Sequence, residues 1–139
     1  MTTNDIVKRL KNYKKIKKAI ISLQRKLNDL DNSYYPKSAH FEQMVTTSKV
    51  NTTEKKLIDN IKKKDDVIDQ IIALTEEKLA VLELIDHLSD YKEWLAITKF
   101  YVLSEDVSII CKDLRLSKTQ LYKVRKKAIE HLEAEVNNT

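Results

Sequence analysis

The chain contains no glycine and only one proline, Pro36. Folds rich in β-strands need glycine or proline turns about every ten residues, and this sequence does not supply them. It therefore predicts an all-α fold, and its 139 residues suffice for one domain or two small ones. The lack of glycine also removes the loops that bind phosphates in P-loop and dinucleotide-binding proteins, so no nucleotide or other cofactor is expected.

The charge of the chain is unevenly distributed. Overall, 26 basic and 21 acidic residues give a net charge of +5. Residues 1–26 hold nine basic residues and one acid, and residues 112–127 hold seven and one, whereas residues 53–93 hold seven basic and eleven acidic residues. Two strongly basic segments favour a polyanion as partner.

Cys111 is the single cysteine, which excludes an intrachain disulfide and agrees with a reducing cytosol. We expect it to be a small core residue. The basic N-terminus lacks the apolar segment of a signal peptide, and no run of eighteen apolar residues exists. These features predict a cytoplasmic protein without a membrane span. His40, His87 and His131 are scattered, so no metal site is expected.

Apolar residues at steps of three and four predict a long helix from about residue 4 to residue 30. They are Ile6, Leu10, Tyr13, Ile16, Ile20, Leu23, Leu27 and Leu30. Lysine and arginine fill many of the other positions. The simplest interpretation of this basic side is a solvated face of a coiled-coil strand; extra phosphate contacts and a membrane-surface helix are the alternatives.

Residues 31–52 interrupt the pattern and predict a connector. Turn-forming residues at 31–33 and the residue before Pro36 disfavour helix, and the polar run at 46–53 predicts a loop or a helix cap. A short helix around residues 40–45 is expected within it. Three aromatic residues either anchor the connector or form a patch that binds a partner, and the sequence leaves this open: Tyr34, Tyr35 and Phe41.

A second long helix is predicted from about residue 53 to residue 88. Its apolar seam comprises Leu57, Ile61, Ile68, Ile71, Ile72, Leu79, Leu82 and Ile85, interrupted at Lys64 and Thr75. Such a seam is typical of a coiled coil or a helical hairpin. The helix therefore pairs either with the first helix or with a second copy of itself, and we favour a homodimer.

The last fifty residues predict a helix-turn-helix. A helix capped by Ser89 would run to about residue 102, with Trp94 as the central aromatic residue of the core. A short helix over 105–113 would be followed by a turn at 115–117 and a helix from residue 118 to about 134, capped by Ser117. The residues expected to face inward are Val107, Ile110, Cys111, Leu114, Leu121, Val124, Ala128 and Leu132.

The spacing of the last two helices has a physical meaning. Helices joined by a turn of three or four residues cross steeply, which lets the second project its first turns into a DNA major groove about 12 Å wide. Its expected exposed face carries Thr119, Tyr122, Lys123 and Lys126. Arg115 stands where such turns commonly have glycine, at a cost of roughly 1 kcal/mol for a left-handed backbone. The alternative is an amphipathic helix with a solvated basic face.

These residues resemble region 4 of sigma factors, and more closely the small phage regulators of the ArpU and RinA type. The resemblance rests on Trp94-Leu95, Phe100-Tyr101, the run Ile110 to Ser117, Leu121, Lys127-Ala128-Ile129 and Leu132. It implies activation of late phage genes in low-GC Gram-positive hosts, and a module that works like region 4 would also contact RNA polymerase. Val107 departs from the family pattern, which often has an aromatic residue there.

The resemblance implies which residues contact DNA. Base contacts are expected from Lys118, Thr119, Gln120, Tyr122 and Lys123. Phosphate contacts are expected from Arg115, Ser117, Arg125, Lys126 and Lys127. No enzyme activity is expected, because Tyr122 as a recombinase nucleophile would need several surrounding Arg or His residues, and the chain has only four arginines.

The sequence thus predicts a basic helix and connector (1–52), a coiled-coil-like helix (53–88) and a C-terminal DNA-binding domain (89–139). Its predicted function is a sequence-specific transcription regulator that binds double-stranded DNA. The alternative is a helical adaptor or inhibitor that binds a protein such as an RNA polymerase subunit.

Overall fold

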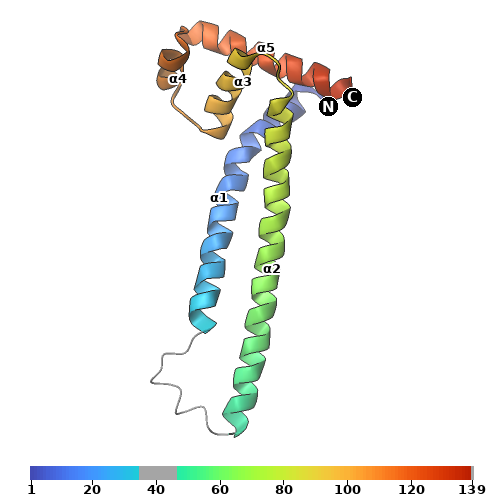
Figure 1. Cartoon of the computed structure of the whole chain (residues 1–139), viewed down its shortest axis with the longest axis vertical. Coiled ribbons are helices and arrows are strands. Elements are labelled where there is room, and N and C mark those ends of the chain that lie inside the picture. Colours follow the sequence, from blue (N-terminus) through green and yellow to red (C-terminus); the bar gives the residue numbers. More distant parts are fainter. Residues whose placement is uncertain (35–46, 139) are drawn as a thin grey trace. The chain divides into compact units, whose positions relative to one another are not determined.

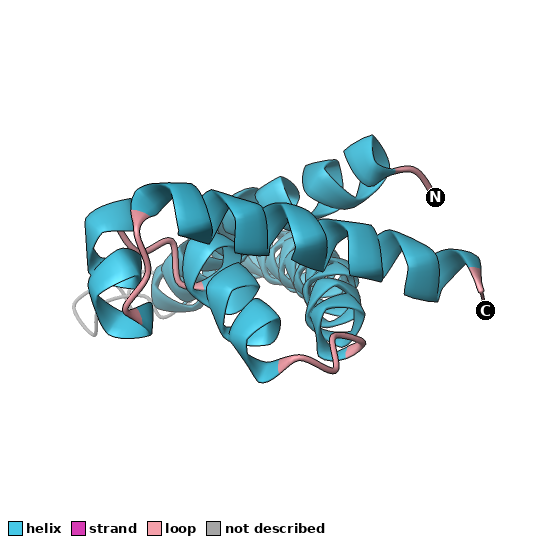
Figure 2. Ribbon diagram, turned by 90° about the horizontal axis from the view of Figure 1, so that it is seen from above, coloured by secondary structure: helices cyan, strands magenta, loops and turns pink. Residues whose placement is uncertain are grey.

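The computed structural model describes residues 1–34 and 47–138, with the side chains of residues 1–32 and 53–138. Every regular element in these ranges is a helix and none is a strand, which confirms the all-α prediction (Figures 1 and 2). The elements are α1 (Thr3–Tyr34), α2 (Thr47–Asp86), α3 (Tyr91–Ile97), the π-helical turn η3 (Thr98–Val102), α4 (Val107–Leu114) and α5 (Lys118–Asn137). None of the described helices is long and apolar enough to span a membrane.

Both long helices extend beyond their predicted limits. The turn-forming residues 31–33 belong to the last turn of α1, and residues 47–53 form the first turns of α2, so the connector prediction is wrong at both of its ends. Contacts between the helices explain the extension of α1. Asp31 forms an ion pair of 2.7 Å with Lys64, and the Asn60 amide donates to the Leu30 carbonyl at 3.4 Å. Packing of this kind commonly overrides weak local preferences.

The rest of the predicted connector lies outside the described residues. This includes the helix expected around residues 40–45 and the aromatic residues Tyr35 and Phe41. The side chain of Tyr34 also lies outside the described part.

The chain forms two compact units, and each long helix contributes to both. Unit 1 comprises Met1–Lys18 and Glu76–Thr139, and unit 2 comprises Ala19–Thr75. Each of the three predicted segments is one continuous stretch of sequence, whereas unit 1 combines two stretches that are distant in the sequence.

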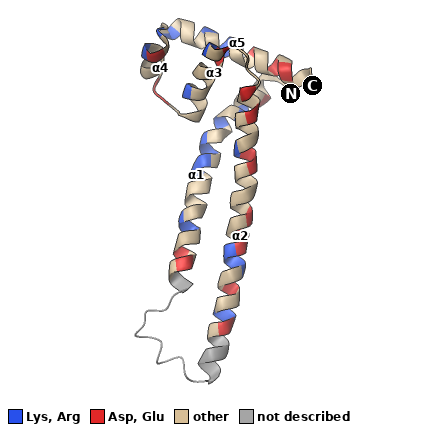
Figure 3. Cartoon of the chain, in the orientation of Figure 1, with Lys and Arg blue, Asp and Glu red and all other residues tan. Residues whose placement is uncertain are grey.

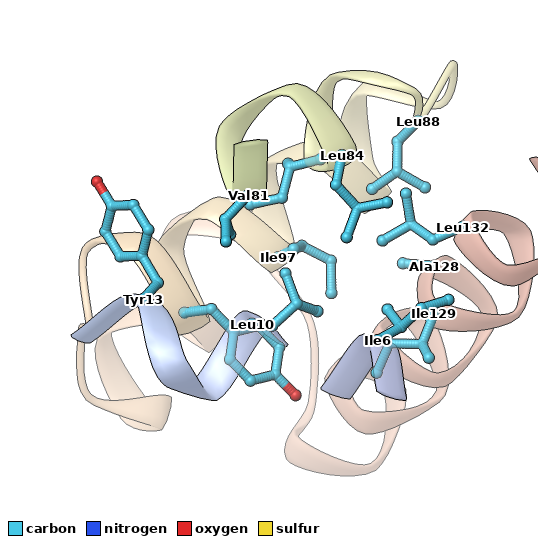
Figure 4. Packing of buried hydrophobic residues seen from close by; sticks show 12 residues of the cluster. Ile6, Leu10, Tyr13, Val81, Leu84, Leu88, Ile97, Ala128, Ile129 and Leu132 are labelled. Atoms are coloured by element: carbon cyan, nitrogen blue, oxygen red, sulfur yellow. The ribbon is translucent and has the colours of Figure 1, made fainter. Parts of the chain in front are cut away.

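The main core lies in unit 1 and draws on the four parts of the chain that meet there (Figure 4). Each contributes a row of apolar side chains, and full burial stabilises such a side chain by about 1.5–3 kcal/mol. The buried members are Ile6, Leu10 and Tyr13 of α1, Val81, Leu84, Ile85 and Leu88 in and after α2, Ile97 and Tyr101, and Ala128, Ile129 and Leu132 of α5. This shared core fixes α5 against the rest of unit 1.

The segment between α2 and α4 differs from its prediction in three respects. Asp90, not Ser89, caps α3, because its carboxylate accepts from the Lys92 amide at 2.8 Å. The helix then widens into η3, which closes with a bond from the Leu103 amide to the Thr98 carbonyl. Trp94 lies at the edge of the core, since its indole N–H donates to Asp86 at the surface over 3.1 Å.

A second, smaller core cluster of unit 1 joins α3, α4 and α5. Its buried members are Ala96, Ile110 and Leu121, and Phe100, Val107, Cys111, Leu114 and Val124 pack against them. The inward face predicted for α4 is confirmed, as is the inward face of α5. Cys111 is a packing residue, as expected.

Unit 2 is a pair of antiparallel helical segments, the end of α1 and the start of α2 (Figure 1). Ile20 and Val67 are buried, and Leu23, Leu27 and Leu30 are half-buried. The seam predicted for α2 is wrong in part: Ile61, Ile68 and Ile72 are exposed here, as is Leu79 in unit 1. The side of α2 that contacts α1 carries Asn60, Lys64 and Val67, about a quarter of a turn away around the helix axis.

Candidate nucleic-acid interface

α4 ends in a backbone motif that normally requires glycine. The Leu116 amide donates to the Cys111 carbonyl at 3.0 Å, and the Arg115 amide donates to the Lys112 carbonyl at 3.4 Å. These two bonds form a Schellman motif, whose residue after the helix cap adopts the left-handed conformation. Arg115 adopts it here, with φ 55° and ψ 44°. The positive φ predicted for this position is confirmed.

Two residues later a capping box starts α5. The Ser117 hydroxyl accepts from the Gln120 amide at 3.2 Å, and the Gln120 side-chain oxygen accepts from the Ser117 amide at 3.0 Å. Reciprocal bonds of this kind satisfy two backbone donors at a helix start, and they confirm Ser117 as the N-cap. They also occupy the side-chain oxygen of Gln120, so its NH₂ group is the part of the side chain that this capping box does not use.

The two motifs lie back to back and make a tight corner between α4 and α5, which we call the α4–α5 corner (residues 107–127). The turn contains Arg115, Leu116 and Ser117, and Leu116 is half-buried. The bonds of the turn are local to residues 111–120, and the packing of Ile110 against Leu121 supports the direction in which α5 leaves α4.

The first half of α5 is basic and the second half is acidic (Figure 3). Residues 118–127 contain five basic residues and no acid, whereas residues 128–138 contain three glutamates. Four of the five cations are exposed: Lys118, Lys123, Lys126 and Lys127. A helix N-terminus itself attracts anions, and here it adds to the positive charge of these lysines.

The buried residues of α5 define the direction in which its solvent face points. Leu121, Ala128 and Leu132 share the buried side. At about 100° per residue, Thr119, Lys123 and Lys126 lie on the opposite side, and all three are exposed. Glu130 comes next on that face and ends the basic row.

Tyr122 and Arg125 do not lie on that open face. The Arg125 guanidinium lies 4.7 Å from the ring centroids of both Tyr122 and Phe100, and the Lys118 ammonium lies 6.0 Å from that of Tyr122. Cation–π contacts of this kind hold both side chains in place. Tyr122 and Arg125 are half-buried, so of the predicted site residues these two are the most engaged in packing.

Polar contacts fix the outer parts of the same module. His131 Nδ1 of α5 lies 2.7 Å from Glu93 Oε2 of α3, and the hydrogen bond to Glu93 raises the pKa of His131. Thr3 of α1 is hydrogen-bonded to Glu133. Since Glu93 is buried, its pairing with His131 satisfies a carboxylate that would be costly to leave alone.

Lys99 ties the loop before α4 to α4 itself. Its ammonium lies 3.2 Å from Glu105 and 3.2 Å from Asp113. The hydrogen bonds to Asp113 and then Glu105 raise the pKa of Lys99. The segment that leads into the α4–α5 corner is thereby held to the helix whose end defines it.

The basic side of α1 is exposed, and part of it borders the same module. Lys11 and Lys14 line a groove together with residues 104–107. That stretch contributes Glu105 and Asp106, so the groove contains acidic as well as basic side chains. This environment favours the interpretation of the α1 cations as a solvated face.

Sequence patterns located the α4–α5 corner but not the contacts that hold it. Phe100 and Arg125 are in contact although they are 25 positions apart in the sequence, and Glu93 and His131 are 38 positions apart. No periodic signal relates such pairs, because they depend on how α3 packs on α5.

No group of three or more His, Cys, Asp or Glu side chains in the described ranges is arranged to hold a metal ion. Comparisons of the chain with protein-family models, with curated proteins and with solved structures found no match.

Proposed function

We propose that the chain binds double-stranded DNA through the first half of α5 and regulates transcription. One observation carries this proposal: a tight corner presents a capped helix start whose solvent face bears lysines and no acid over residues 118–127. A helix presented in this way fits the major groove, and cations at its start suit phosphates.

Within this proposal the residues divide by position. Thr119 and Lys123, at the centre of the exposed face, contact bases. Arg115, Lys126 and Lys127 contact phosphates. Tyr122 and Arg125 position the helix, since the Arg125 guanidinium contacts the rings of both Tyr122 and Phe100, in place of the direct DNA contacts that the sequence suggested for them.

The biological role follows the resemblance to phage regulators. We propose an activator of late genes that acts as a homodimer in the host cytoplasm, so that two copies of the α4–α5 corner read two half-sites. Contact with RNA polymerase belongs to the same proposal, since region 4 modules act beside the promoter.

Fluorescence anisotropy with a labelled duplex from the region upstream of the gene tests DNA binding. We expect tighter binding to this duplex than to a shuffled duplex of equal composition. If about six phosphates are neutralised, log K should fall with log salt with a slope of about −5. Equal affinity for both duplexes at moderate salt would contradict the proposal.

Point variants separate the two kinds of contact. Lys123→Ala should cost about 1–3 kcal/mol on the preferred duplex and reduce the preference itself. Lys127→Ala should weaken binding to both duplexes alike and reduce the salt slope by about one. Lys92→Ala removes an exposed lysine from α3 and serves as the matched control, which should bind like the wild type.

A second candidate function is docking to a protein, as an adaptor or an inhibitor. Two large apolar side chains of unit 1, Leu103 before α4 and Ile109 on α4, are about half exposed, at 54% and 48%. In that case Ile109→Lys would abolish binding to the partner protein while Lys123→Ala would leave it unchanged. RNA polymerase prepared from a low-GC Gram-positive host is the partner protein to use in this binding measurement.

A further inference from the structure

The structure leaves one side of α2 in unit 2 both apolar and open to solvent. We call it the outer face of α2, and its members are Ile58, Ile61, Asp65, Ile68 and Ile72. The four isoleucines are between 40% and 53% exposed. Isolated exposed apolar residues are common, but several large ones on one side of a helix, here two pairs on either side of Asp65, mark an interaction surface.

The spacing of this row indicates what kind of surface covers it. Its members follow one another at steps of three, four, three and four residues, which is the heptad repeat of a coiled coil. The outer face of α2 is separate from the side that packs on α1, where Val67 is only 2% exposed. A second helix with the same repeat is therefore the partner that fits.

The charges along α2 indicate which helix this is. Residues 54–64 contain five lysines and two acids, whereas residues 65–75 contain three aspartates and no basic residue. The helix is thus basic in one stretch and acidic in the next. Two copies of α2 complement each other when they run antiparallel and repel each other when they run parallel.

We propose that two copies of this chain associate through the outer face of α2 in an antiparallel, two-fold symmetric pair. The heptad places the symmetry axis between residues 66 and 67. Ile61 then lies opposite Ile72 of the other copy, and Asp65 lies opposite Ile68. A parallel pair would instead set Asp65 against Asp65 within the seam.

The flanking positions fit the same register. Lys62 and Asp69 are exposed and lie seven residues apart on the side of the heptad that borders the outer face. In the antiparallel pair Lys62 of each copy faces Asp69 of the other, so symmetry creates this contact twice. Charged residues at such positions determine partner and orientation in coiled coils. This inference does not depend on DNA binding by α5.

Sedimentation equilibrium over a range of protein concentrations is the first measurement. The wild type should form a dimer, and Ile68→Lys should be monomeric with unchanged helix content by circular dichroism. Gln70→Lys adds the same charge on the far side of α2, at an exposed position, and should remain a dimer. A monomeric wild type, or a dimer that Ile68→Lys leaves intact, would overturn the proposal.

Charge reversal tests the register. Lys62→Glu should raise the dimer dissociation constant about tenfold, because each dimer loses two contacts and gains two repulsions. Combining Lys62→Glu with Asp69→Lys should restore dissociation to within about threefold of the wild type. Lys63→Glu makes the same charge change on the side away from the outer face and should have no effect. Failure of the double variant to recover would contradict the antiparallel register.

Disulfide cross-linking tests the orientation. In a Cys111→Ala background, one preparation carries Ile61→Cys and another carries Ile72→Cys. The two positions lie about 16 Å apart along one helix, too far to bridge within a chain. The antiparallel pair predicts a cross-linked dimer when the two preparations are mixed and much less from either alone. Efficient cross-linking of either preparation alone would show a parallel pair and refute the proposal.

Discussion

The single helix α2 is covered very differently in the two units. In unit 1 its residues Val81, Leu84 and Ile85 are almost fully buried, because α1, α5 and the segment around Ile97 all contribute to the same core. In unit 2 its residues Ile58, Ile61 and Ile72 are about half exposed, although this part of the helix holds five of its six isoleucines. The difference lies in the number of partners, since one neighbouring helix covers only one side of another.

This contrast shows what an apolar helical pattern does and does not specify. The pattern predicts that a side of the helix will be buried, but it does not say against what. Unit 1 buries its pattern within the chain, and unit 2 leaves part of its pattern exposed to solvent.

The largest expected effect comes from truncating one isoleucine in each unit. Ile97→Ala, at a fully buried position, should lower the free energy of unfolding by about 2–5 kcal/mol because it leaves a cavity. Ile68→Ala, at a site 40% exposed, should lower it by about 0.5 kcal/mol or less in the monomer. Urea denaturation, at a concentration where sedimentation shows a monomer, measures both. Similar losses for the two variants would mean that the outer face of α2 is covered within the chain.

The same contrast explains how far the sequence could predict the fold. The row from Ile6 to Ile20 predicted the buried side of α1 correctly, because that segment has one continuous apolar stripe. α2 has two apolar stripes, and their residue patterns alone do not decide which one contacts α1. The structure shows that the stripe through Val67 does so, with Asn60 and Lys64 bonded to the end of α1.

The α4–α5 corner was more predictable than its surroundings, because its geometry depends on local bonds. Ser117 and Arg115 occupy the positions that the sequence indicated, since a cap and a left-handed residue leave signals within a few positions. The stacking of Arg125 between Tyr122 and Phe100 left no such signal, because Phe100 reaches this place through the widened turn η3.

A smaller effect is expected at Arg115. It tests whether the stability of the α4–α5 corner depends on backbone conformation rather than on the packing that stabilises the rest of unit 1. Glycine has no steric cost at this φ of 55°, which stabilises the folded state by roughly 1–2 kcal/mol. Its greater conformational freedom also stabilises the unfolded state, by about 0.5–1 kcal/mol. Arg115→Gly should therefore stabilise unit 1 by about 0.5–1 kcal/mol in urea denaturation. The same variant should bind DNA more weakly, since it loses a proposed phosphate contact. Destabilisation would show that the Arg115 side chain contributes packing that outweighs the strain.

The smallest effect concerns pH and the pair of Glu93 and His131, which lies in unit 1. The hydrogen bond to Glu93 raises the pKa of His131 above its ordinary value of 6.5. The stabilisation from this pair is therefore complete below about pH 6.5 and is lost as the pH rises through the folded-state pKa. The wild type should be more stable than His131→Gln at pH 6, and this difference should shrink by pH 9. The effect should be modest, because the His131 side chain is 61% exposed and solvent screens the pair.

His87→Gln makes the same substitution at a histidine outside the pair and should show no such trend in urea denaturation. A difference between wild type and His131→Gln that is constant from pH 6 to pH 9 would show that the contact joins α3 and α5 without a charge on the histidine.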